Sequence, residues 1–368
     1  MRLYKKYSSC LALIILSVLA GCTKVELCDM EIHPHLSQVA FSYDWNGYEN
    51  EKPDSLTLVV SRIVDTYHDA FSLSSSDMPA SENGPVNADT NGSIGLRSGE
   101  YFMMTFNRSD RLIVQNLDTF LADKQVSLKD LSIRIKALKR DEIPQLGGEL
   151  WVDFNPGYSY VSNEGVIFMG KMNNVKLFTG ISASLRFAPK PLTQKINLDF
   201  KLEMLPDEET HEVVEVEEVI AEMSGVATTI YPVSGLIRAT SFGRFIFQPK
   251  LINREGQVYN YRGVINAFGL VGGEDVSAIS GLGVLRLGVY VKLGDKKKIL
   301  RVSANLSEKI KEAGLTRYSD DGNGLVKARD EGTIRVEQEL KISPEAVSKE
   351  SPDGVSGWHV EEFIDFDV

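Results

Sequence analysis

Alternation of apolar and polar residues is the feature that most limits how this chain can fold. The clearest run has apolar side chains at every second position, with polar or charged residues between them: Ile196, Leu198, Phe200, Leu202 and Met204. Successive side chains of a β-strand point to opposite faces, so the run predicts a strand with one buried and one solvated face. Similar runs lie at 39–45, 133–135, 285–291 and 334–342. The sequence therefore predicts an all-β protein with antiparallel sheets.

Few segments have the spacing of a helix. Residues 306–313 are the best candidate, with Asn305 available as a cap and Gly314 as a stop. Residues 112–121 fit a strand or a helix. Strands that recur without long helices between them are typical of β-sandwiches, and the helices are expected to be connectors.

Two segments interrupt the strand pattern. Residues 74–99 are rich in Ser, Asn, Gly, Asp and Pro, which predicts an exposed and mobile loop. Two prolines in Ala188-Pro189-Lys190-Pro191 separate strand-like segments on either side. The length of the chain favours two domains, so we expect an N-terminal domain at 22–188 and a C-terminal domain at 192–368.

The first residues have the pattern of a signal peptide. A cationic start at 2–6 precedes an apolar run at 11–19, which is too short to span a bilayer as a helix. The tetrad Leu19-Ala20-Gly21-Cys22 then resembles the bacterial lipobox. This resemblance implies that residues 1–21 are removed and that Cys22 becomes acylated. More than one acyl chain on Cys22 would fix the protein permanently to membrane lipid.

Charge and cysteine content restrict the partners further. The formal net charge is −11, and the loss of a cationic signal segment makes it more negative, so nucleic acid is not an expected partner. After processing, Cys28 is the only free thiol. It is expected to be buried or paired between molecules, since it has no partner for an internal disulfide.

No motif for catalysis is complete. Gly281-Leu282-Gly283 lacks the third glycine of a dinucleotide fingerprint, and His211-Glu212 lacks the second His of a zinc-protease helix. We therefore expect no enzyme activity, no cofactor and no small-molecule substrate.

Three polar clusters have structural interpretations. The acid-rich run at 207–222 is interpreted as a solvated hairpin, and Asp320, Asp321 and Asn323 as a turn without the later ligands of a calcium loop. His33-Pro34-His35 could present two imidazoles to one side of a strand, but two ligands do not make a metal site. We expect no metal.

Several landmarks together resemble one protein family. They are Cys28 with His33-Pro34-His35, the strand ending at Asp44-Trp45, the segment Ser98-Gly99-Glu100-Tyr101, the segment 221–225 and the terminal strand ending at 365–368. In order and spacing the chain is similar to the fimbrial anchor and minor-subunit lipoproteins of Bacteroidales. The resemblance implies two tandem transthyretin-like β-sandwich domains, an outer-membrane location at the cell surface, and fimbrial subunits as partners. It implies neither catalysis nor a cofactor.

Two functions follow from these observations. The leading one is a structural adhesion component that links a fimbrial polymer to the outer membrane. The alternative is a surface glycan-binding lipoprotein, which would need a platform of exposed aromatic residues. Trp45, Trp151 and Trp358 are instead spaced like core residues.

Two further sites are predicted. Asp54-Ser55-Leu56 resembles a bacterial O-glycosylation acceptor, which makes Ser55 a possible glycosylation site. The end of the chain alternates apolar and charged residues, and its apolar positions are Trp358, Val360, Ile364, Phe366 and Val368. This segment is predicted to be a strand that either completes its own sheet or is donated to a neighbouring subunit.

Overall fold

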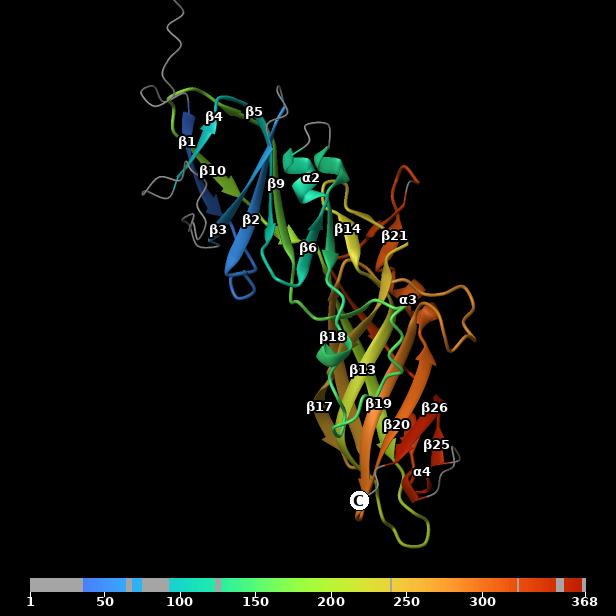
Figure 1. Ribbon diagram of the computed structural model, residues 1–368. Coiled ribbons are helices and arrows are strands. Elements are labelled where there is room, and N and C mark those ends of the chain that lie inside the picture. The colour runs from blue at the N-terminus through green and yellow to red at the C-terminus, as the bar shows by residue number, and fades with distance from the viewer. Residues whose placement is uncertain are drawn as a thin grey trace, which may run out of the picture.

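β-Strands form most of the described chain, which confirms the all-β prediction (Figure 1). The computed structural model describes residues 36–63, 68–74, 93–122, 127–238, 240–322, 324–348 and 354–365. The predicted signal peptide at 1–21, Cys22, Cys28 and His33-Pro34-His35 lie outside these ranges.

Two sheets face each other in the part of the chain that comes first. The smaller sheet consists of β1 (Leu36–Tyr43), β4 (Ile94–Arg97) and β10 (Ala183–Phe187). The larger consists of β2 (Ser55–Arg62), β3 (His68–Ser74), β5 (Gly99–Asn107), β9 (Phe168–Leu177) and β11 (Lys190–Pro191). Buried residues of both sheets share one apolar cluster, which includes Phe41, Leu58, Tyr101 and Phe187. This arrangement is a β-sandwich.

Two longer sheets form a second sandwich. One consists of β12 (Gln194–Met204), β17 (Lys250–Glu255), β18 (Val258–Ala267), β23 (Glu331–Arg335), β24 (Leu340–Ile342) and β25 (Val355–Ser356). The other, termed here the outer sheet, consists of β8 (Tyr160–Ser162), β13 (Glu215–Ala227), β16 (Phe242–Phe247), β19 (Val284–Leu293), β20 (Lys296–Asn305) and β26 (His359–Asp365). Both contribute to the largest apolar cluster.

A third six-stranded sheet lies between the two sandwiches in Figure 1. Its strands are β6 (Leu112–Gln115), β7 (Ser132–Ile135), β14 (Thr229–Tyr231), β15 (Leu236–Ile237), β21 (Thr316–Tyr318) and β22 (Leu325–Lys327). The described helices are short connectors: α2 (Leu117–Ala122), η1 (Leu128–Asp130), η2 (Arg140–Glu142), α3 (Ser307–Ala313) and α4 (Glu345–Ser348). Among the described residues, no helix has both the length and the apolar character needed to cross a membrane.

The strand β12 shows how the alternation produces burial. Ile196, Leu198 and Leu202 are fully buried, whereas the polar residues that alternate with the apolar ones are partly or fully exposed. β12 pairs antiparallel with β18, and Leu198 lies opposite Gly263. A Cβ atom at Gly263 would lie 2.1 Å from the ring of Phe247, so the absence of a side chain lets that ring pack against the sheet.

Most strand pairs are antiparallel, but parallel pairs join segments that are distant in the sequence. β1 pairs with β10, β8 with β16, and β12 with both β23 and β24 in the parallel direction. A parallel pair needs a crossover connection, so these partners come from far along the chain. The transthyretin-like strand order inferred from the resemblance stays a prediction.

The predicted domain boundary at 188–191 contains β11, which pairs with β9 and is the last strand of the first sandwich. β12 then begins at Gln194 in the second sandwich. The segment 112–162 precedes this boundary, yet β7 pairs with β14 and β8 pairs with β16. The division into domains at 22–188 and 192–368 therefore stays a prediction. With that division, strands from 112–162 of the N-terminal domain would pair with strands of the C-terminal domain.

The local predictions have mixed outcomes. α3 matches the expected helix: the Asn305 side chain accepts a hydrogen bond from Ser307 N at 2.8 Å, and Gly314 adopts the left-handed conformation that ends the helix. The predicted loop at 74–99 is too long, because residues 94–97 form β4 and pair with β1. Ile94 and Leu96 are buried there. Two apolar residues within a long polar segment were too few to indicate a strand from the sequence.

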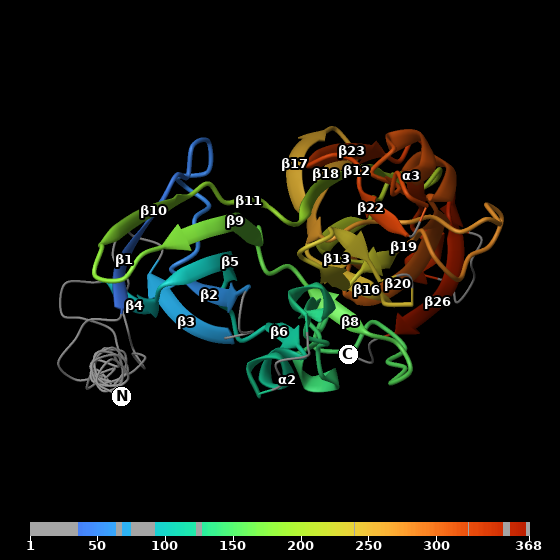
Figure 2. The same ribbon diagram turned by 90° about the horizontal axis from the view of Figure 1, so that it is seen from above.

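The two ends of the described chain lie far apart. β1 and β26 are at opposite ends of the molecule in both views (Figures 1 and 2). A chain that starts in one sandwich and ends at the edge of another can therefore contact different surroundings at its two ends.

Candidate functional site

A segment without regular strands covers part of the outer face of the outer sheet. Residues 136–159, termed here the strap, follow β7 and run along β13 and β19 (Figure 1). Leu146 and Trp151 of the strap form a small buried cluster with residues from four strands of the sheet, including Ile220 and Ile299. The strap thus has its own apolar contact with this face.

Gly288 of β19 makes this contact possible. A Cβ atom at Gly288 would lie 2.7 Å from the Trp151 ring and 3.0 Å from Leu146. Trp151 is 1% exposed. A side chain at position 288 would therefore push the strap away from the sheet.

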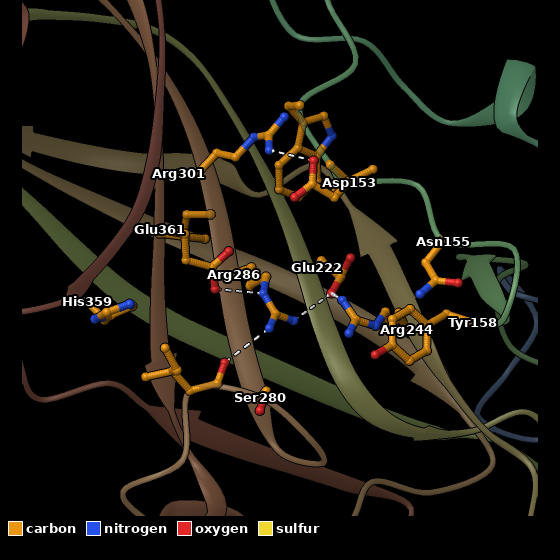
Figure 3. Close-up of a pocket in the computed structure, with 14 residues that line it drawn as sticks. Asp153, Asn155, Tyr158, Glu222, Arg244, Ser280, Arg286, Arg301, His359 and Glu361 are labelled. Atoms are coloured by element: carbon orange, nitrogen blue, oxygen red, sulfur yellow. Dashed lines mark hydrogen bonds and ion pairs between the residues drawn. The ribbon is translucent and has the colours of Figure 1, made fainter. Parts of the chain in front are cut away.

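Beside the strap, charged side chains alternate in sign across neighbouring strands. Glu222 of β13 lies between Arg244 of β16 and Arg286 of β19, with N–O distances of 2.7 Å and 3.1 Å (Figure 3). Arg286 also contacts Glu361 of β26 at 2.8 Å, and its Nη2 donates to the carbonyl oxygen of Ile279 at 3.0 Å. The row links four strands of the outer sheet and one loop.

A third arginine of the outer sheet holds the strap through polar contacts. Arg301 of β20 contacts the carboxylate of Asp153 at 3.1 Å and donates to the carbonyl oxygen of Leu150 at 3.3 Å. Asp153 is almost fully exposed, whereas the Arg301 side chain is largely buried. The strap therefore has a polar attachment to the sheet in addition to its apolar one.

Because Glu222 is buried, it depends on its two arginine partners. The Glu222 side chain is 1% exposed, so its charge is removed from water and must be compensated by Arg244 and Arg286. Burial alone would lower the pKa of Arg286, but Glu361 and Glu222 outweigh this effect and hold that pKa above its usual range. The guanidinium group of Arg286 therefore stays charged.

A hollow of about 500 Å³ opens above this row of charges, between the strap, the loop at 274–282 and β26 (Figure 3). We term it the outer hollow. Tyr158 stands at one side, with its ring 3.8 Å from the guanidinium carbon of Arg244. Most of the lining residues have polar or charged side chains: Asp153, Asn155, Tyr158, Glu222, Arg244, Ser280, Arg286, Arg301, His359 and Glu361.

The structure brings together residues that the sequence did not single out as a site. Glu222 was included in the acid-rich run interpreted as a solvated hairpin. That interpretation is correct for the turn, where Asp207 accepts hydrogen bonds from Glu209 N and Thr210 N, but it is wrong for Glu222. Glu222 instead belongs to a largely buried stretch of β13, and a charge amid Ile220, Ala221 and Met223 was the available signal.

None of the described residues that were predicted as sites lines the outer hollow. Ser55 is the first residue of β2 and is partly exposed, and its glycosylation stays a prediction. Trp358 is buried, and its Nε1 donates to the carbonyl oxygen of Gln338 at 2.9 Å. Trp45 and Trp151 are buried as well, so all three tryptophans occupy core positions as predicted.

The terminal strand is present as β26 and pairs antiparallel with β20, at the edge of the molecule's own outer sheet. Ile364 lies opposite Ile299, and Val360 lies opposite Val302. Phe366 and Val368 lie outside the described residues. Donation to a neighbour would require β26 to leave β20, and it stays a prediction.

Neither acidic cluster forms a metal centre. Within the ranges that the structure describes, no group of three or more His, Cys, Asp or Glu side chains could hold a metal ion. Asp320 and Asp321 lie in a turn, and Asp320 contacts Arg317 at 2.6 Å. Asn323 lies outside the described residues.

Comparison with known proteins finds similarity in structure alone. No family model and no curated protein matches the chain. A candidate adhesin from Bacteroides ovatus is 10% identical with a TM-score of 0.47, and the match covers 79% of this chain and 89% of that one. The fimbrial anchor protein Mfa2 from Porphyromonas gingivalis is 11% identical with a TM-score of 0.41, over 89% of this chain and 99% of that one.

A third solved structure is described as a candidate polysaccharide-binding protein from Bacteroides thetaiotaomicron. It is 12% identical with a TM-score of 0.41, and the match covers 90% of this chain and 95% of that one. All three structures come from species of Bacteroidales, the group whose lipoproteins the sequence resembles.

Proposed function

We propose that this chain is a lipid-anchored protein of the outer membrane that links a fimbrial polymer to the cell surface, as a fimbrial anchor or minor subunit. The observation that supports it most is the position of two features. Cys22, the expected site of acylation, precedes β1 in the sequence, and β1 and the edge strand β26 lie at opposite ends of the described part of the molecule (Figure 2). A chain attached at one end can contact a polymer at the other.

The edge of β26 supports the second half of the proposal. β26 ends the outer sheet, and among the described strands only β20 pairs with it. An edge strand presents backbone N–H and C=O groups that can pair with a strand of another chain. Contact with a subunit along this edge, or through donation of the terminal strand, would join the polymer to the anchored chain.

Affinity purification from the native host tests both halves. The tagged chain is solubilised from membranes, and the copurifying proteins are identified by mass spectrometry. We expect a fimbrial subunit in amounts comparable to the tagged chain. Recovery of a glycan-import complex without a fimbrial subunit would contradict the proposal and favour the alternative of a glycan-binding lipoprotein.

Substitution of Cys22 provides the matched test of the anchor. We expect Cys22→Ser to leave the membrane fraction, because the thiol that accepts the lipid is lost. Membrane retention of Cys22→Ser, together with incorporation of labelled fatty acid, would contradict the acylation of Cys22.

A further inference from the structure

The outer hollow has the size and composition of a ligand site. Its volume of about 500 Å³ lies within the roughly 300–1,000 Å³ of small-ligand sites. Hydrogen-bonding groups from four separate parts of the chain converge on it: Asn155 of the strap, Arg244 of β16, Ser280 of the loop and His359 of β26. A purely structural ion-pair row would not require these additional groups around an open space.

Charge balance indicates the class of ligand. The lining contains three guanidinium groups and three carboxylates, and each arginine already contacts at least one carboxylate. A ligand with a formal charge would face a group of its own sign within the row. A ligand with many hydroxyl groups can instead accept from the guanidinium groups and donate to the carboxylates at the same time.

The polar groups are held in place before a ligand arrives. Arg286 is fixed by Glu222, Glu361 and the carbonyl oxygen of Ile279. Arg244 is held between Glu222 and the ring of Tyr158. Binding would therefore order few side chains, and the entropy cost of association would be small.

Apolar surface lies beside these groups. Tyr158 is 49% exposed and Ile279 is 42% exposed, and they belong to the lining of the same hollow. The C–H face of a sugar ring packs against such aromatic and aliphatic surface, while its hydroxyl groups contact planar polar side chains. The combination of both kinds of surface favours a sugar over an inorganic anion, which has no apolar face.

We propose that the outer hollow binds a short neutral oligosaccharide, with Tyr158 and Ile279 against its rings, and Arg244, Asn155 and His359 at its hydroxyl groups. This site shares β26 with the proposed fimbrial contact, because His359 of β26 lines the hollow whereas the contact would use the free edge of that strand. An adhesion component that holds a polymer at one edge can bind a glycan on an adjacent face.

Binding is measured on the full lipidated chain, purified in a detergent without a sugar headgroup. The probes are neutral di- to tetrasaccharides built from glucose, galactose, mannose and N-acetylglucosamine, compared with sialyllactose and a heparin tetrasaccharide. An array identifies the probe with the strongest signal, and titration calorimetry gives its Kd. We expect saturable binding of at least one neutral probe and weaker binding of both charged ones.

Three variants locate the site. Tyr158→Ala is expected to weaken binding about tenfold, since loss of an aromatic contact costs on the order of 1.4 kcal/mol. His359→Ala should weaken it by a smaller factor. Tyr318→Ala is the matched control, because Tyr318 is 72% exposed and is not among the lining residues. Thermal melting verifies that all three variants are folded.

Each contrary result overturns the proposal. Absence of binding to any neutral probe at millimolar concentration excludes an oligosaccharide site on this chain. Binding only of the charged probes excludes the ligand class. Neutral binding that Tyr158→Ala and Tyr318→Ala leave equally unchanged places the glycan outside the outer hollow.

Discussion

Substitution of Glu222 by glutamine tests how far the ion-pair row stabilises the fold. Gln has the shape of Glu but no charge, so Glu222→Gln removes the negative charge between Arg244 and Arg286 without opening a cavity. The Glu222 side chain is 1% exposed and the side chains of Arg244 and Arg286 are each 15% exposed, so water replaces little of the lost interaction. The variant should therefore unfold more easily than the wild-type chain.

The magnitude follows from the burial of the partners. Removal of one member of a fully buried ion pair costs about 3–5 kcal/mol. Arg286 keeps Glu361 and the carbonyl oxygen of Ile279, and Arg244 keeps the ring of Tyr158, so a value of about 2–3 kcal/mol is expected here. For a domain of the size of the second sandwich, this loss in the free energy of unfolding corresponds to a decrease in Tm of about 5–10 °C.

Urea denaturation and thermal melting measure this effect. Glu218→Gln is the matched control, because Glu218 lies on the same strand and its side chain makes an exposed hydrogen bond to Gln248 at 3.1 Å. That substitution should change the free energy of unfolding by less than about 0.5 kcal/mol. If Glu222→Gln is as stable as Glu218→Gln, the row is not a stabilising element and the reasoning is wrong.

Three further predictions concern the strap, His68 and the terminal strand. Gly288→Val should release the strap and raise protease cleavage within 136–159, and unchanged cleavage would contradict the close contact with Trp151. Burial lowers the pKa of His68, and the centre of its ring lies 4.0 Å from that of Phe120. The folded chain therefore favours the neutral ring and should lose stability as the pH falls below about 6.5. His68→Phe should reduce this loss, and an equal decrease in Tm in both chains between about pH 7.5 and 5.5 would refute it. Deletion of 361–368 should lower the Tm by several degrees, because β26 pairs with β20; unchanged stability with lost capture of a fimbrial subunit would support strand donation.

The strands were predictable because burial on one face appears directly in the sequence. β12 and β19 follow their alternating residues closely, and the three tryptophans occupy the core positions that their spacing indicated. The helix α3 was predictable for a local reason as well, since both of its end signals lie within the segment. Each of these features depends on residues that are near one another in the chain.

The candidate site depends on residues that are far apart in the chain. Glu222 and Arg286 are brought together by the register between β13 and β19, and Asp153 reaches Arg301 through the strap. Sequence periodicity contains no information about strand order or register between distant segments. The charge at Glu222 was visible, but its neighbours were not, and the acidic residues before it favoured a solvated interpretation.

The attachment of a polymer through this chain is tested most directly by counting filaments on cells of the native host. Electron microscopy and fractionation compare a strain that produces the wild-type chain with one that produces Cys22→Ser at equal levels. The proposed function predicts that filaments of the Cys22→Ser strain are found in the medium together with the variant protein. Filaments that remain on the cells in equal number would contradict it.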